Sequence, residues 1–112
     1  MKKLLLATLT ASLVVSSAFA GVTAGNYKGN NGNLSIKQNM QFSYDSDNGG
    51  MNMCMIDGTF QKQGNVLQYE EQNCKMVISA KSANAIHLEV SGDCSYFCGM
   101  GASVDTEDMS KK

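Results

Sequence analysis

Hydrophobic and polar residues alternate along most of this chain, beginning at Leu34 and Ile36, which are separated by Ser35 and followed by Lys37. The same two-residue period recurs at 41–45, 54–61, 67–70, 74–79 and 86–91. A period of two predicts strands with one buried face and one solvated face. No segment after residue 20 shows sustained helical spacing of apolar residues. The pattern therefore predicts about six or seven short strands and no long helix.

Segments rich in Gly and Asn separate these strands, at 30–32, 47–50, 64–65 and 91–93. Short turns join antiparallel neighbours, so we predict an all-β fold in which an antiparallel meander forms a small barrel or flattened sandwich. Segment 25–29 is expected to supply the opening strand and segment 99–104 the closing one. Segment 105–112 is polar and lacks the alternation, so it is expected to form a flexible tail.

The first twenty residues have the layout of a secretory signal peptide. Lys2 and Lys3 precede an apolar stretch at 4–15, and Ala18-Phe19-Ala20 places small residues at the −3 and −1 positions of a cut before Gly21. The apolar stretch is shorter than the ~20 residues that span a bilayer. We therefore expect cleavage after residue 20, no membrane span, and a single β domain at 21–104 in the periplasm or the medium.

All four cysteines, Cys54, Cys74, Cys94 and Cys98, follow the predicted cut. An even number of cysteines in a short exported domain predicts disulfides. A metal site of four thiolates usually shows two close cysteine pairs, and here only Cys94 and Cys98 are close. In a meander all four collect near one rim of the barrel. We favour Cys74–Cys94 with Cys54–Cys98, because the strands bounded by Cys74 and Cys94 should be hairpin partners. Cys54–Cys74 with Cys94–Cys98 remains the alternative.

Composition narrows the functional class. Without Lys2 and Lys3 the chain carries seven lysines against ten acidic residues, a net charge of −3, and it contains no arginine. A nucleic-acid partner is therefore not expected, since such proteins present a basic face.

No set of catalytic residues can be assembled from the sequence. Nucleophilic hydrolysis needs a Ser or Cys beside an oriented His, and His87 is the only histidine and lies on a predicted solvated face. The spacing of Cys94 and Cys98 is not that of a thioredoxin-like CxxC motif. We therefore predict that the chain is not an enzyme and needs no cofactor.

Methionines at every second position form the most unusual local feature. Met51, Met53 and Met55 project from the strand face opposite Cys54, which is the predicted solvated face. One hypothesis is an adaptable protein-contact surface that includes Met53 and Met55. The other is a Cu(I) site formed by the three thioethers with His87.

The segment between the last two cysteines is a second candidate for partner contact. Tyr96 and Phe97 lie in a short loop flanked by Cys94 and Cys98, and a loop fixed by cross-links loses little entropy when it binds. The alternative is that one of these aromatic rings closes the end of the barrel.

The signal peptide, the Gly25-x-Tyr27-x-Gly29 start, the alternating strands and the late Cys94-x-x-x-Cys98-Gly99 resemble small exported four-cysteine β proteins of bacteria. The layout over 21–104 is broadly similar to that of the periplasmic lysozyme inhibitors. Their Ser-Gly-x-x-Tyr type of inhibitory stretch is not evident, and segment 99–103 departs from it. The resemblance implies a small disulfide-bearing barrel.

The expected function is non-catalytic binding of a protein, with inhibition of a lysozyme-type cell-wall hydrolase as the specific hypothesis. A Cu(I) carrier and a barrel with a small-molecule ligand are the competing classes. The ligand-carrying barrel is disfavoured, because about 15 inward side chains should fill a barrel of this size.

Overall fold

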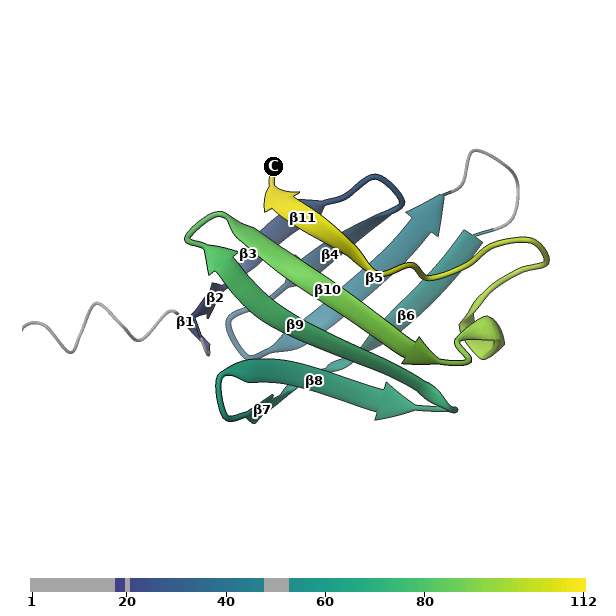
Figure 1. Cartoon of the computed structure of the whole chain (residues 1–112), viewed down its shortest axis with the longest axis horizontal. Helices are drawn as coiled ribbons and strands as arrows, with labels where there is room; N and C mark the ends of the chain where they lie inside the picture. The colour runs from purple at the N-terminus through teal and green to yellow at the C-terminus, as the bar shows by residue number, and fades with distance from the viewer. Residues whose placement is uncertain (1–17, 20, 48–52) are drawn as a thin grey trace, which may run out of the picture.

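The structure is a computed structural model that describes residues 18, 19, 21–47 and 53–112. It is all-β apart from one turn of 3-10 helix, η2 at Ser95–Phe97 (Figure 1). The strands are β1 Ala18–Phe19, β2 Val22–Thr23, β3 Gly25–Lys28, β4 Gly32–Ile36, β5 Gln41–Asp47, β6 Met53–Thr59, β7 Gln61–Gln63, β8 Val66–Glu71, β9 Cys74–Ser82, β10 Ala85–Gly92 and β11 Glu107–Lys111.

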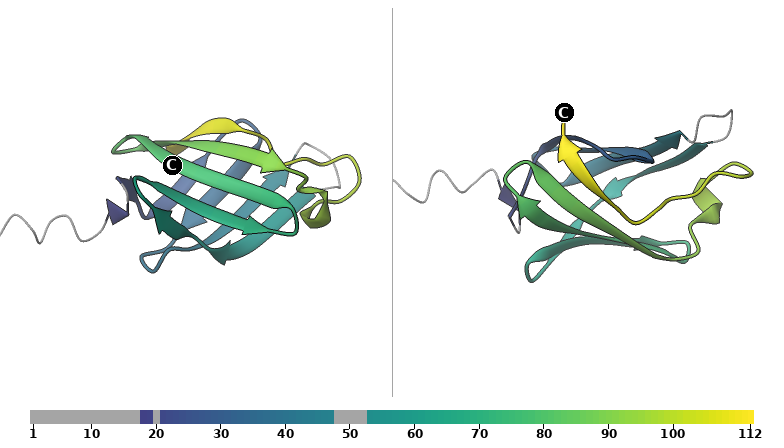
Figure 2. Two further views of the ribbon diagram at one scale, coloured as in Figure 1. Left: turned by 60° about the horizontal axis from the view of Figure 1, so that its bottom comes forward. Right: turned by 45° about the horizontal axis from the view of Figure 1, so that its top comes forward.

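Nine of these strands form one antiparallel sheet in the order β6-β5-β4-β3-β11-β10-β9-β8-β7. The two outer strands, β6 and β7, are successive parts of one bent stretch of chain, in which only Phe60 separates Thr59 from Gln61. The first part pairs with β5 and the second with β8, so the sheet curls into a nearly closed barrel (Figure 2). The predicted antiparallel meander is confirmed.

Alternate residues of the longer strands β4, β6, β9 and β10 point into the barrel, as the sequence pattern predicts. On β6, Cys54 and Ile56 are buried whereas Met53 and Met55 are exposed. Large side chains from all around the barrel pack together in one core inside it. The side chains that are less than 2% exposed to solvent include Tyr27, Leu34, Tyr44, Ile56, Phe60, Leu67, Met76, Ile78, Ile86, Leu88 and Met109.

The closing strand is not where the sequence pattern placed it. Segment 99–104 forms no strand, and the predicted flexible tail at 105–112 contains β11, which lies between β10 and β3 and pairs with both. The tail prediction is therefore wrong, and the domain extends past residue 104. Met109 is the only large apolar residue of β11, so no alternation marks the strand, yet its side chain is 1% exposed.

Polar contacts hold the beginning of β11 in place. The Glu107 carboxylate accepts hydrogen bonds from the backbone N–H groups of Asn31 and Gly32, both at 2.9 Å. Asp108 pairs with Lys81 Nζ at 2.8 Å and with His87 Nδ1 at 2.7 Å. These contacts join β11 to the β3–β4 turn and to β9 and β10.

Segment 99–106, which leads to β11, covers one end of the barrel. The Ser103 carbonyl accepts hydrogen bonds from Asn31 Nδ2 at 3.1 Å and from the buried Ser46 Oγ at 3.2 Å. Ala102 and Val104 pack against the core. Burial beneath this segment, together with the nearby Glu107 carboxylate, raises the pKa of Tyr44 to about 12.

The predicted signal peptide lies mostly outside the described residues. Ala18 and Phe19 form β1 and pair with β2, where Val22 is buried. Cleavage after residue 20 stays a prediction. In the part of the chain that the structure describes, no helix has the length and apolar character needed to cross a membrane.

Candidate protein-contact surface

Two disulfides gather the cysteines at one end of the barrel. Cys74 bonds to Cys94 and Cys54 bonds to Cys98, which is the pairing favoured from the sequence. The register of β9 with β10 explains the first bond, because Gly92 lies opposite Cys74 and brings Cys94 beside it. Disulfides of this kind are typical of an oxidising, extracellular compartment.

The Cys54–Cys98 bond attaches the loop after β10 to the beginning of β6. The two cysteines form an antiparallel β-bridge, and the Gly99 N–H donates a hydrogen bond to the Met53 carbonyl at 3.0 Å. The loop therefore lies along the outer edge of β6.

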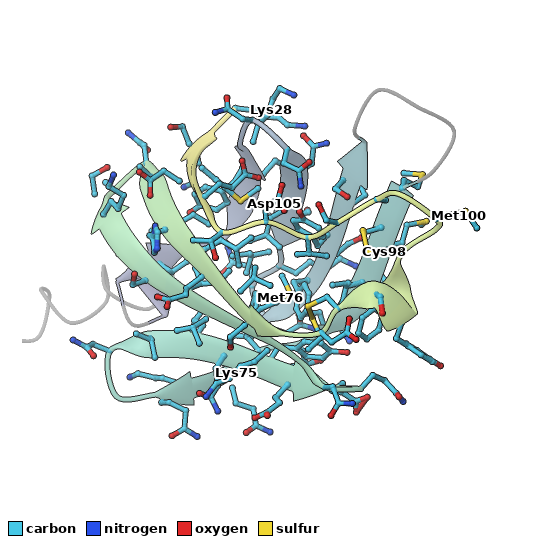
Figure 3. The ribbon with its side chains drawn as sticks, turned by 45° about the vertical axis from the view of Figure 1, so that its right-hand side comes forward. Lys28, Lys75, Met76, Cys98, Met100 and Asp105 are labelled. Carbon is cyan, nitrogen blue, oxygen red and sulfur yellow. A yellow bond between two sulfur atoms is a disulfide. The ribbon has the colours of Figure 1, made fainter. Side chains whose placement is uncertain are left out.

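This attachment brings together the large hydrophobic side chains that the described residues leave exposed. Met53 and Met55 on β6 are 39% and 59% exposed, and Tyr96 and Met100 in the loop are 69% and 86% exposed. We call these four residues the disulfide rim. Figure 3 shows Met100 projecting from the loop beyond Cys98. The structure thus joins the methionine row and the aromatic loop, which the sequence presented as separate candidates.

The two aromatic residues of the loop have different roles. Their rings pack edge to face with centroids 5.1 Å apart, but Phe97 is half-buried and contacts the core whereas Tyr96 points to solvent. At the start of the turn that carries them, Asp93 Oδ1 accepts a hydrogen bond from the Ser95 N–H at 3.0 Å, and this bond lowers the pKa of Asp93. Phe97 therefore supports the loop, and Tyr96 is the ring available to a partner.

The structure does not bring His87 to the methionines. His87 lies near the start of β10, whereas the rim loop follows the opposite end of that strand at Gly92. Its Nδ1 contacts Asp108, and the sheet neighbours of β10 are β9 and β11 rather than β6. Met51, the first residue of the proposed copper set, lies outside the described residues.

A groove lies beside the rim, between β6 and β8. It encloses about 550 Å³ and is lined by Asp57, Gly58, Thr59, Gln61, Gln68, Tyr69, Glu70 and Glu71. Tyr69 extends toward Gly58, where an added Cβ atom would lie 2.5 Å from the tyrosine ring, so the glycine makes room for that ring. Partial burial and the carboxylates of Glu71 and Asp57 raise the pKa of Tyr69. The groove is therefore negatively charged.

All four cysteines are bonded to one another, so they offer no free thiol. Within 18, 19, 21–47 and 53–112, no group of three or more His, Cys, Asp or Glu side chains is arranged to hold a metal ion. What the end offers is exposed thioether and aromatic surface on a cross-linked support, beside an acidic groove.

Sequence reasoning missed two parts of this surface. Met100 escaped notice because it lies between Gly99 and Gly101 in a turn and belongs to no periodic pattern. The groove arises from two strands that fail to pair, which local alternation does not reveal.

No family model, curated protein or solved structure matches this chain. The resemblance to periplasmic lysozyme inhibitors therefore stays a prediction from layout.

Proposed function

We propose that this chain is an exported, non-catalytic binding protein of the periplasm or medium that contacts another protein through its disulfide rim. The observation that carries the proposal is the gathering of Met53, Met55, Tyr96 and Met100 at one end of the barrel. Clustered exposed hydrophobic side chains on a small domain mark interaction sites.

The rim has the physical properties of a binding surface. The Cys54–Cys98 bond and the hydrogen bond between Asp93 and Ser95 fix the turn that carries Tyr96 before a partner arrives, so binding costs little conformational entropy. A rigid tyrosine supplies apolar area together with a hydroxyl group, and methionines adapt to irregular surfaces.

Inhibition of a lysozyme-type cell-wall hydrolase is the specific function that we propose for the rim. The net charge of −3 after residue 20 would attract a basic lysozyme and accelerate encounter, in a manner that salt weakens. The predicted export of the chain and its similarity in layout to the periplasmic lysozyme inhibitors also support this function.

We expect the chain from Gly21 onward to slow lysozyme clearance of a cell-wall suspension at a near-stoichiometric dose. Tyr96→Ala should weaken inhibition by about tenfold or more, because it removes the aromatic anchor of the contact. Its melting temperature should hardly change, since the side chain is 69% exposed. Gln63→Ala, on exposed β7, is the control and should inhibit like the parent chain. Unimpeded clearance by the parent chain would reject the inhibitor function.

Cu(I) binding is a second candidate, favoured by the three exposed thioethers of Met53, Met55 and Met100. Thioethers are soft ligands that suit Cu(I). The parent chain should then withdraw Cu(I) from a chromophoric chelator, and joint replacement of these residues and Met51 by Ser should abolish the withdrawal. Tyr96→Ala should leave it intact. A parent chain that withdraws no Cu(I) would exclude this function.

A further inference from the structure

We infer that the free edge of β6, together with the facing part of β8, binds an extended basic segment of a partner protein as an added β-strand. This inference rests on the proposed binding function and adds a second contact beside the disulfide rim.

The barrel is open at one seam. β6 pairs with β5 at 53–59 and β7 pairs with β8 at 61–63, but the described residues form no ladder between β6 and the end of β8 at 69–71. An unpaired strand edge presents a row of backbone donors and acceptors and is a ready template for another strand.

The hydrogen-bond pattern identifies which groups of β6 face the seam. Alternate residues of an antiparallel strand direct their backbone groups to opposite sides. The Phe60 N–H bonds to the Met40 carbonyl on the β5 side, whereas the Met53 carbonyl accepts the Gly99 N–H on the other side. By this alternation, the residues of β6 whose backbone groups face the seam beyond Met53 are Met55, Asp57 and Thr59.

The opposite wall of the seam follows the same rule. Gln72 and Asn73 have positive φ values of 50° and 66° and form the two-residue turn between β8 and β9. Such a turn is closed by a hydrogen-bonded pair, here Glu71 with Cys74, so the backbone of Glu70 faces the seam.

The chain itself already occupies the beginning of this edge. Cys98 forms its β-bridge with Cys54 there, and the Gly99 N–H bonds to Met53. The edge of β6 therefore accepts antiparallel pairing, and the free part begins directly after this bridge.

Charge identifies the occupant. The residues lining the groove include the three carboxylates of Asp57, Glu70 and Glu71, with no lysine among them. Among the lysines near the groove, Lys75 lies opposite Glu70 on β9, Lys62 lies on β7, and Lys37 lines a neighbouring pocket that shares Asp57. A segment with Lys or Arg at every second position would direct these side chains toward one face of the seam. In a symmetric antiparallel pairing of two β6 edges centred on Asp57, this carboxylate would face its own copy, which opposes self-association.

The test uses the disulfide-bonded chain and a fluorescent, capped peptide with the sequence Lys-Val-Lys-Val-Lys-Val. We expect saturable binding by fluorescence anisotropy, and shifted amide NMR resonances at 55–59 and 69–71. Replacing Lys by Glu in the peptide should abolish binding. Asp57→Asn with Glu70→Gln should weaken it about tenfold. Glu89→Gln with Asp105→Asn removes the same charge elsewhere and should have little effect.

A peptide of the same sequence, N-methylated at alternate residues on its pairing edge, separates strand addition from plain charge attraction. The methylated peptide should no longer bind. If it binds as tightly as the unmethylated peptide, or if the unmethylated peptide does not bind at all, the inference is overturned. Dimers of the unliganded chain in sedimentation, abolished by an Asp57→Lys substitution, would identify a second copy as the occupant and also overturn the inference.

Tyr96→Ala should leave peptide binding intact. Peptide binding without lysozyme inhibition would therefore reject the inhibitor function alone, and inhibition without peptide binding would reject the strand-addition site alone.

Discussion

Reduction of both disulfides is expected to unfold the barrel at or near 37 °C, because a small domain depends strongly on such cross-links. The bonds span 44 residues for Cys54–Cys98 and 20 for Cys74–Cys94. In the chain-entropy model, loops of these lengths contribute roughly 4 and 3 kcal/mol to the free energy of unfolding. The shorter loop lies inside the longer one, so the joint contribution is below the sum. It is still comparable with the about 5–15 kcal/mol that a typical domain has in total.

Thermal unfolding followed by near-UV circular dichroism measures this effect, with the oxidised chain compared with the reduced and alkylated one. Cys54→Ser with Cys98→Ser should lower stability more than Cys74→Ser with Cys94→Ser, because it opens the longer loop. Intact mass should show four hydrogens fewer in the oxidised chain, which verifies the starting material. A reduced chain that keeps its spectrum and melting temperature would show that the cysteines do not stabilise the fold.

The sequence predicted the strands wherever one face of a strand is filled by several apolar residues. Cys74, Met76 and Ile78 on β9 and Ile86 and Leu88 on β10 are buried, as their two-residue spacing requires. The disulfide pairing followed from the same reasoning, because adjacent strands bring Cys74 and Cys94 to one end.

Other features depend on contacts between residues far apart in the chain, and local patterns do not record them. Strand β11 is held by Glu107 at the turn containing Asn31, 76 residues away. The disulfide rim exists because Cys98 is bonded to β6, and the open seam exists because the chain pairs with β5 before Phe60 and with β8 only after it. The pairing of distant strands and cysteines, rather than the two-residue period of the sequence, determines these features.

Deleting residues 106–112 is expected to abolish the stable fold, although the sequence pattern predicted a flexible tail at 105–112. The deletion removes the strand between β10 and β3 and leaves both edges without a partner. Loss of the fully buried Met109 side chain alone should cost about 2–5 kcal/mol. Each charge-assisted hydrogen bond to Glu107 contributes about 1.5–3 kcal/mol. Together these losses approach the whole stability of a typical domain.

Single substitutions resolve the effect of that deletion into its parts, measured by urea unfolding of the oxidised chain. Met109→Ala should lose about 2–5 kcal/mol through the cavity that it leaves. Glu107→Gln should lose less, because the amide oxygen still accepts one of the two N–H groups, although without a charge. Ser110→Ala, exposed on the same strand, should stay within about 0.5 kcal/mol of the parent.

If the deleted chain and Met109→Ala both unfold at the same midpoint urea concentration as the parent chain, β11 contributes nothing to the stability of the barrel and the expectation of a flexible tail is right. If only the deletion destabilises, strand pairing and the Glu107 contacts, rather than the buried methionine, hold the seam between β10 and β3 closed.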